Sequence, residues 1–305
     1  MMENTRLYKS SNIQSFKLLL TTLLFFYVAL TFSSGAGYSY VISQLAGALF
    51  FTQMFILLHE CGHNSFFKTP QLNFALGQIA GLLTFIPFYN WQKIHNLHHQ
   101  WTGYRDKDPT TEGTLNKPRG LVYYLANVSW RLFIPLFAIG YRFGIYWNIP
   151  KLKKHLTPVK FKMARLQLIL FSIFYVVVFA SFGSWLIKFL PAYILSLIFT
   201  ELIILSQHSY INMPLAKNEK VMPMKPLEQA LYTRSLHLPH FFAYWVLFNV
   251  NLHEAHHAYP TMPCYNLQNA KYQSDRTVNF HYWFFKAKKT PATDYVFNTK
   301  SDFTF

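Results

Sequence analysis

Four long apolar stretches place the strongest constraint on what this chain can fold into. They cover residues 18–32, 38–58, 166–182 and 185–205. A membrane-spanning helix needs about 20 mostly apolar residues, so flanking Ser, Gly and Tyr positions must extend the first and third stretches. Only 13% of the residues are charged, and 31 are Phe, which is unlike an ordinary soluble protein. We therefore predict an all-α integral membrane protein with four transmembrane helices.

The four stretches form two pairs, because only "SSGAGYS" separates the first two and "SFGS" the last two. Three Lys and Arg residues precede the first stretch, 14 lie between the second and third, and 10 follow the fourth, which leaves only Lys188 outside these segments. Positively charged loops stay on the cytoplasmic side of membranes. We predict two helical hairpins with both termini and all thirteen histidines on the cytoplasmic side, held in a helical cap.

Other segments yield weaker expectations. Residues 72–88 are apolar but interrupted by Gly77, Gly81 and Pro87, so a short re-entrant or interfacial hairpin is expected there. Residues 121–149 mix aromatic residues with two arginines and predict an interfacial helix. A single domain over 1–305 is expected, with flexible cytoplasmic tails at 1–15 and 290–305. A cleaved signal peptide is the alternative at the N-terminus, but its removal would leave an odd number of spans.

Histidine is concentrated in three short boxes that follow or lie between the spans. The boxes are "HECGH" (His59, His63), "HNLHH" (His95, His98, His99) and "HEAHH" (His253, His256, His257). In a helix, positions i, i+3 and i+4 share one face, so the three imidazoles of a box are expected to converge on one point. His208 lies at the end of the fourth span and delivers a ninth histidine. These residues predict a metal site.

The metal itself has two possible identities. Two boxes also read H-E-x-x-H, the signature of zinc proteases, in which the glutamate activates water. That interpretation needs only one such box, whereas the spacing occurs twice here and the middle box has Asn96 in place of the glutamate. Nine imidazoles exceed the needs of one tetrahedral zinc and favour two metal ions of higher coordination. Cys61 and Cys264 imply no disulfide framework and are expected to be packing residues.

Several further residues are candidates for supporting roles. Asp106, Asp108, Glu60 and Glu254 can accept a hydrogen bond from the second nitrogen of a ligating histidine, or can simply be solvated or paired with Arg105 and Lys107. Glu201 lies within the fourth span, where an acid is either functional or paired with a neighbouring helix. His237 and His240 are expected to pack or to support the site, and His155 and His281 to lie at the surface.

The boxes, together with "DKDP" and "NLHEAHHAYPTMPCYNL", make the chain resemble the membrane fatty acid desaturases and their hydroxylase and carotenoid-oxygenase relatives. The resemblance covers residues 46–267. It implies that metal ligation falls on all eight box histidines, with His208 as the ninth ligand. Animal acyl-CoA desaturases pair that extra histidine with an asparagine four residues earlier, where this chain has Ile204. The resemblance is therefore nearer to acyl-lipid or carotenoid-type members.

The resemblance also implies cofactors and partners. Two iron ions (Fe2+) would use dioxygen to remove hydrogen from an unactivated carbon of a lipid or acyl chain that arrives from the membrane. Hydroxylation or ketolation of a lipid or carotenoid is the alternative on the same scaffold. A separate donor of the ferredoxin or cytochrome b5 type is expected, since no fused redox domain is visible, and the +16 net charge would attract an acidic carrier or anionic lipid. No nucleic acid partner is expected. A membrane metal transporter is disfavoured because the histidines lie outside the spans.

Overall fold

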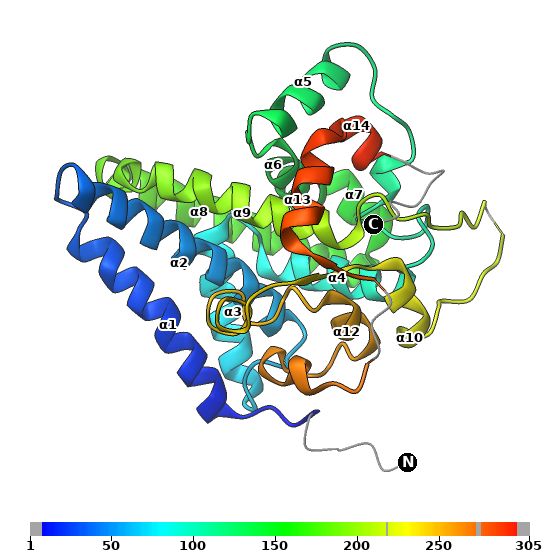
Figure 1. The fold of residues 1–305 in the computed structure, drawn as a ribbon, viewed down its shortest axis with the longest axis horizontal. Coiled ribbons are helices and arrows are strands. Elements are labelled where there is room, and N and C mark those ends of the chain that lie inside the picture. The colour runs from blue at the N-terminus through cyan, green and yellow to red at the C-terminus, as the bar shows by residue number, and fades with distance from the viewer. Residues whose placement is uncertain (1–7, 218, 273–275, 298–305) are drawn as a thin grey trace.

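Four long apolar helices form one end of the molecule (Figure 1). They are α1 (Asn12–Thr31), α2 (Tyr38–Gly62), α8 (Pro158–Lys188) and α9 (Leu190–His208). The computed structural model of the chain describes residues 8–217, 219–272 and 276–297. Within these residues the same four helices are long and apolar enough to cross a membrane, as predicted, and the bent pair Pro70–Thr84 and Phe88–Trp101 would make a fifth if it were one span.

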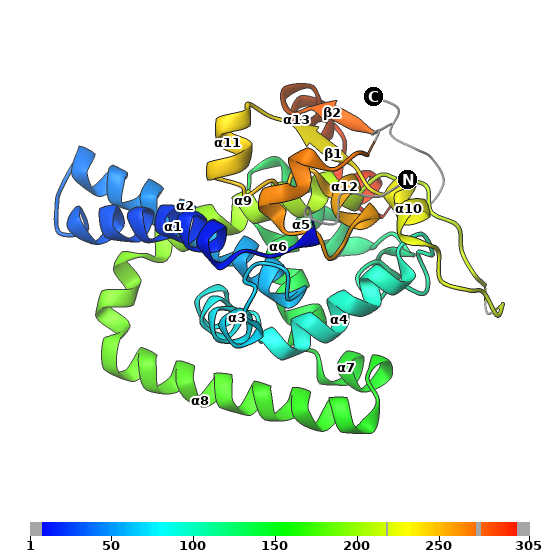
Figure 2. The ribbon, with the colours of Figure 1, turned by 90° about the horizontal axis from the view of Figure 1, so that it is seen from below.

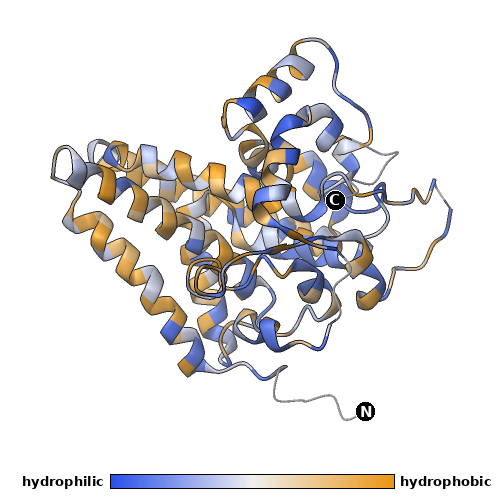
Figure 3. Ribbon diagram, in the orientation of Figure 1, coloured by the Kyte–Doolittle hydropathy of each residue, from blue (hydrophilic) through white to orange (hydrophobic). Residues whose placement is uncertain are grey.

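Helix α2 is the centre of this bundle. It packs against α1, α3 and α9. In its most apolar 18-residue segment 72% of the residues are buried, compared with 11% in that of α8. Apolar residues dominate the bundle, whereas hydrophilic residues are concentrated toward the opposite end of the molecule (Figure 3). Both short connections, α1 to α2 and α8 to α9, lie together at the far end of the bundle (Figures 1 and 2). The segments that follow α2 and α9 therefore leave the bundle at the same end.

The boundaries of the third and fourth spans, α8 and α9, differ from the predicted ones. Residues 181–184, expected to form the connection, are not a loop, but the helix is kinked there at Phe182 (φ −130°, ψ 15°). The turn into α9 is completed at Phe189, and Pro191 lies in the first turn of α9. Ser and Gly do not stop a helix by themselves, whereas a proline cannot donate the backbone hydrogen bond that a continuing helix needs. The proline therefore sets the helix start.

The predicted interruption between residues 72 and 88 is a sharp bend. Helices α3 (Pro70–Thr84) and α4 (Phe88–Trp101) meet at 101°, and Phe85 adopts a left-handed conformation (φ 56°) between them. Gly77 and Gly81 lie inside α3 and do not break it. A Cβ at Gly81 would approach the Ile86 carbonyl oxygen to 2.7 Å, so glycine there permits the close packing of the bend.

The segment 121–149 is not one interfacial helix, as predicted, but several short ones. Helix α5 (Gly120–Arg131) is followed by α6 (Leu136–Tyr141), a π-helical turn η3 (Arg142–Tyr146) and α7 (Ile149–His155). Pro135 separates the first two helices. Asn148 caps α7 by accepting a hydrogen bond from the Lys151 amide, and such a cap starts a new helix.

The remaining elements are short and lie over the open end of the bundle (Figure 2). The helices are η2 (Glu112–Thr114), α10 (Pro226–Gln229), η4 (Ala230–Tyr232), α11 (His240–Trp245), α12 (His253–Ala258), η5 (Cys264–Asn269), α13 (Phe280–Lys289) and α14 (Ala292–Tyr295). Strands β1 (Ser235–His237) and β2 (Thr277–Asn279) pair in parallel. The described residues are otherwise mostly helical, which agrees with the predicted all-α class. The two strands were not predicted, because three-residue strands are too short to show an alternating pattern.

Parts of the predicted tails are structured. Residues 12–15 belong to α1, where Ser15 is buried. At the other end, α14 packs against α5, and its Tyr295 is fully buried beside Trp130 and Trp283. Large aromatic side chains provide enough buried area to order this segment. Residues 1–7 and 298–305 of the predicted tails lie outside the described residues.

Candidate metal centre

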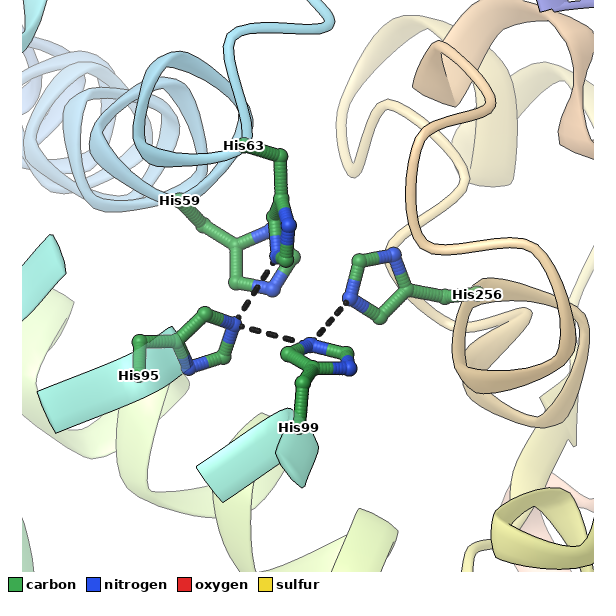
Figure 4. Close-up of side chains that lie close together, drawn as sticks. All are labelled: His59, His63, His95, His99 and His256. Carbon is green, nitrogen blue, oxygen red and sulfur yellow. Dashed lines mark hydrogen bonds between the residues drawn. The ribbon is translucent and has the colours of Figure 1, made fainter. Parts of the chain in front are cut away.

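The nine histidines named from the sequence converge where the bundle meets the short elements. His59 lies in the last turn of α2, with His63 just after it, and His208 is the last residue of α9. The middle box lies on α4 and the third box on α12. The spans therefore position two of the four histidine-bearing segments, and the bend at Phe85 directs α4 across the end of α2. Figure 4 shows five of the rings facing one another.

The histidines form two groups. The five-histidine group contains His59, His63, His95, His99 and His256, and the four-histidine group contains His98, His208, His253 and His257. Within each group, one nitrogen of every ring lies within 4.8 Å of the corresponding atom of every other. The nine residues are thus divided between two potential ligand shells rather than spread along a path.

Each three-histidine box contributes to both groups, which corrects the expectation that a box converges on one point. His95 and His99 enter the five-histidine group, but His98 enters the other. The third box is divided in the same way, because His253 and His257 enter the four-histidine group and His256 enters the five-histidine group. At about 100° per residue, i and i+4 are only about 40° apart, whereas i+3 and i+4 are about 100° apart. Helices α4 and α12 therefore bridge both groups.

Several ring nitrogens approach one another closely. Nε2 of His95 lies 2.9 Å from Nε2 of His63 and 3.1 Å from Nε2 of His99, and the last lies 3.1 Å from Nε2 of His256. In the other group, Nε2 of His208 and of His253 are 2.8 Å apart. Two imidazoles bound at a right angle to one metal at about 2.0–2.1 Å have nitrogens about 2.9 Å apart, against about 3.3 Å at a tetrahedral angle. Ring nitrogens this close together can bind one common metal ion in each group.

Unsatisfied buried nitrogens support the same fit. Nε2 of His59 and Nε2 of His257 are buried and have no hydrogen-bond partner among the described residues. The opposite nitrogen of each ring is occupied, since Nδ1 of His59 lies 2.8 Å from Glu60 Oε1 and Nδ1 of His257 lies 3.5 Å from Gln229 Oε1. A buried imidazole nitrogen without a partner is costly unless a ligand satisfies it. The donor set therefore fits one metal ion in each group.

The electrostatics keep the rings available as ligands. Burial, followed by the neighbouring imidazoles, lowers the pKa of His63, His256 and His257 well below the usual value. These rings are consequently neutral near pH 7, and a neutral imidazole has the lone pair that a metal binds.

Two of the four predicted acids support histidines. Glu60 binds His59, and Asp108 Oδ2 lies 2.7 Å from Nδ1 of His98. Burial alone would raise the pKa of Asp108, but the His98 ring and hydrogen bonds from Thr110 outweigh it and lower the pKa. Asp108 is therefore ionised and fixes the orientation of His98.

The other two acids bind the backbone instead. Asp106 accepts hydrogen bonds from the amides of Ala216 and Lys217, and Glu254 accepts from the amides of Ser235 and Arg276. Their predicted contact with a ligating histidine is not what the structure shows. Both carboxylates hold irregular segments, whose amides have no partner within a helix or long strand.

Other predicted residues have structural contacts. His237 is exposed at the end of β1, and His240 is exposed and bonded to Gln268 Oε1, so neither packs in or supports the site. His281 is exposed, as expected, whereas His155 is half-buried beside Glu112. Glu201 Oε2 accepts the amide of Ala138 at 2.9 Å, which is the predicted pairing with a neighbouring helix. Cys61 and Cys264 are buried and free.

Sequence reasoning missed Gln229 and Thr110. Gln229 lies in a four-residue helix 28 positions before His257, so no local spacing could indicate it. The Thr110 hydroxyl donates to Asp108 Oδ1 at 2.8 Å, and its place two residues after Asp108 is a recognisable Asx-type signal.

A cavity of about 80 Å³ lies between the two groups. Apolar side chains of Phe55, Ile86, Ile203, Ile204 and Val250 form much of its wall. Rings from both groups, namely His59, His95, His98, His208 and His253, also line it. An apolar ligand in this cavity would contact both potential metal sites at once.

The sequence profile described as "Fatty acid desaturase" matches residues 16–289, which include all nine histidines. The chain belongs to the fatty acid desaturase family. This match confirms the resemblance noted from the histidine boxes, and in this desaturase-family chain the boxes form the two histidine groups.

Individual relatives agree with the family. The chain is 27% identical to an sn-1 acyl-lipid omega-3 desaturase (ferredoxin) of Synechocystis over 76% of its length and 66% of the relative. It is 26% identical to a fatty acid desaturase of Bacillus subtilis over 72% of the chain and 64% of the relative. An sn-1 oleoyl-lipid 12-desaturase of Picosynechococcus is 24% identical, again over 72% and 64%. The chain thus spans about two thirds of the length of these curated relatives.

Proposed function

We propose that this chain is a membrane-bound di-iron oxidase that uses dioxygen and external electrons to desaturate a fatty acyl chain of a lipid. The observation that carries the proposal is the cavity between two histidine groups, because an apolar chain there is next to both potential metal sites. The relatives named as acyl-lipid desaturases support the same substrate class. The residues proposed as ligands are the nine histidines of the two groups.

The wall of the cavity suits an unbranched acyl chain, because the side chains of Phe55, Ile203 and Ile204 are apolar. Relatives of this chain are named as desaturases of acyl lipids. Desaturation of a fatty acyl chain is therefore preferred to ketolation of a carotenoid.

The overall stoichiometry requires a separate electron donor. Two bound iron ions would supply the oxidising power to break an unactivated C–H bond. Removing one hydrogen from each of two adjacent methylenes while dioxygen becomes two waters consumes two further electrons and two protons. The protein's own contribution is to hold the ligand rings through Glu60, Asp108 and Gln229, and to exclude water with the apolar wall.

The protease alternative finds no support in the site. Glu60 would have to activate water, but its Oε1 is bound to His59 and its Oε2 accepts the amide of Cys264 at 3.2 Å. Glu254 is likewise committed to backbone amides. A carboxylate fixed by such contacts is a positioning group and is poorly placed as a general base.

The membrane arrangement proposed from the sequence completes this function. The four apolar helices would form two hairpins, with both short connections outside the cell and the histidine groups on the cytoplasmic side. The charge distribution supports this orientation. Of the 28 basic residues, 27 lie before residue 18, between residues 59 and 165 or after residue 205, which are the segments proposed to be cytoplasmic.

The decisive experiment is lipid analysis of a host that expresses the chain. Gas chromatography with mass spectrometry should detect fatty acids with a new double bond, and His98→Ala should abolish that product while the protein still inserts in the membrane. A hydroxylated product would identify the alternative chemistry. Retained desaturation in the His98→Ala variant would contradict the proposed ligand set.

A further inference from the structure

Backbone carbonyl groups at the end of α3 need hydrogen-bond donors from outside the helix. The last four carbonyls of any helix have no α-helical partner within it, and the bend at Phe85 turns α4 away from them. The chain itself satisfies one, because the Gly81 carbonyl accepts the Ile86 amide at 3.0 Å. Where water is scarce, as beside membrane helices, the remaining carbonyls need side-chain donors.

Three other elements supply these donors. The hydrogen bonds are Tyr175 OH to Leu82 O (2.9 Å), Trp147 Nε1 to Phe85 O (2.9 Å), and both Arg142 Nε (2.9 Å) and Tyr193 OH (3.0 Å) to Thr84 O. Tyr175 belongs to α8 and Tyr193 to α9, whereas Arg142 is the first residue of η3 and Trp147 follows η3. The bend is therefore held by segments that are distant from it in the sequence.

Arg142 makes the strongest of these connections. Its side chain is buried, and its Nη1 also donates to the Ala138 carbonyl at 2.9 Å. A buried guanidinium is costly unless hydrogen bonds and an opposite charge compensate it. Glu201 Oε2 accepts the Ala138 amide at 2.9 Å, so the backbone of Ala138 lies between the two opposite charges. Arg142 thus links α9 and α6 to the end of α3.

The direction of α4 affects both histidine groups. Helix α4 begins at Phe88, three residues after the bend. It contributes His95 and His99 to the five-histidine group and His98 to the four-histidine group. A rotation of α4 about the bend would therefore displace ligands of both groups together, whereas a change at α2, α9 or α12 alone would leave these three in place.

We propose that Arg142 is a positioning residue for both metal sites, because its hold on the end of α3 sets the direction of α4. This inference rests on the proposed function, since it takes the α4 histidines to be metal ligands. Arg142 also lines the cavity between the groups, so the residue that holds the bend is next to the site that the bend positions.

Cobalt binding tests the proposal without measuring activity. Co2+ is added to the full-length apoprotein in detergent, its visible absorption is recorded, and its affinity is found by competition with a chelator. In a His208→Ala background Co2+ reports the five-histidine group, and in a His63→Ala background it reports the four-histidine group. Arg142→Met keeps an unbranched stem but no donor. It should weaken binding at least about tenfold in both backgrounds and alter both spectra.

Two further substitutions separate positioning from general stability. Arg142→Lys keeps the charge and can donate to one carbonyl, so it should recover part of the affinity in both groups. Arg234→Met is the matched control, because Arg234 is also buried and its Nη1 donates to the carbonyls of Ser206 (2.9 Å) and Ser209 (3.2 Å). Those residues flank His208, so this variant should weaken the four-histidine group alone.

A distance measurement follows α4 itself. Spin labels are attached to cysteines placed at Asn96 on α4 and Leu227 on α10, which are both exposed. The distance distribution between the labels should be broader in Arg142→Met than in the otherwise wild-type protein, with no metal present. This measurement needs neither cobalt nor product formation.

The outcomes are distinguishable. A folded Arg142→Met protein with unchanged cobalt affinity and spectrum, even at a lower melting temperature, would overturn the proposal, as would a loss confined to one group. If Arg142→Met does not fold, Tyr193→Phe/Trp147→Phe removes a donor from each of two carbonyls and keeps both rings. Unchanged cobalt binding in that variant would also overturn the proposal. If the wild-type protein binds no Co2+, the proposed function fails, and the spin-label distances still decide whether Arg142 directs α4.

Discussion

The carboxylate of Asp108 lies 2.7 Å from Nδ1 of His98, and both side chains are buried. Hydrogen bonds from the Thr110 amide and hydroxyl hold the other carboxylate oxygen. His98 is thereby fixed with Nε2 directed to the four-histidine group. This relationship joins the "DKDP" segment to the middle box across a gap of ten residues.

We expect Asp108→Asn to weaken metal binding in the four-histidine group by about 10- to 100-fold, because the carboxylate sets the tautomer and basicity of His98. The measurement is metal retained per chain during dialysis against a graded chelator. Asp106→Asn is the control, since Asp106 binds only the Ala216 and Lys217 amides in the contacts described. Equal metal loss in both variants would argue against the orienting role.

Purified protein should contain about two metal ions per chain, because each histidine group has enough donors for one ion. His208→Ala should reduce the content to about one and leave the five-histidine group loaded. His63→Ala should do the converse. Elemental analysis by mass spectrometry measures both, and a wild-type content near one ion would contradict the two-site arrangement.

Ile204 lines the cavity between the groups. Ile204→Trp should therefore block the acyl chain and reduce product formation by at least about tenfold, while metal content stays at the wild-type value. Ile194→Trp is the matched control, since Ile194 lies on the same helix but is exposed. Normal product formation by Ile204→Trp would remove this cavity from the substrate path.

The bend between α3 and α4 depends on Gly81. Gly81→Ala would place Cβ 2.7 Å from the Ile86 carbonyl oxygen and 3.2 Å from the Phe88 nitrogen, and backbone atoms cannot move aside easily. We expect a loss of about 1–3 kcal/mol in the free energy of unfolding. Gly140→Ala meets nothing within 4 Å and should have almost no effect. Thermal unfolding of the two variants in the same detergent decides the comparison.

The orientation of the spans can be tested by cysteine labelling in intact cells. Cys61 and Cys264 are fully buried, so they should contribute little background. Ser34→Cys, in the exposed α1–α2 connection, should react with a membrane-impermeant thiol reagent, whereas Lys220→Cys should react only after permeabilisation. Reversed labelling would move the histidine groups to the outer face, beyond the reach of cytoplasmic electron carriers.

The sequence by itself determined the four spans and the identity of the histidines. Runs of apolar residues such as 38–58 must be buried in protein or lipid whatever the rest of the chain does. The i, i+4 pairs, such as His95 with His99, follow from helix geometry alone. Short-range patterns of this kind need no knowledge of distant segments.

Only the tertiary structure decided how the histidines are divided. His98 joins His208 and not the rest of its own box, and His256 joins His59, because the histidine at position i+3 of each three-histidine box points to the neighbouring group. The partners Gln229 and Asp108 likewise depend on packing between segments. The bend at Phe85 and the close packing at Gly81 set the direction of α4. No local sequence pattern shows which helices α4 will contact after that bend. Contacts between distant segments decide the site, since a helix fixes the directions of its side chains but not what they meet.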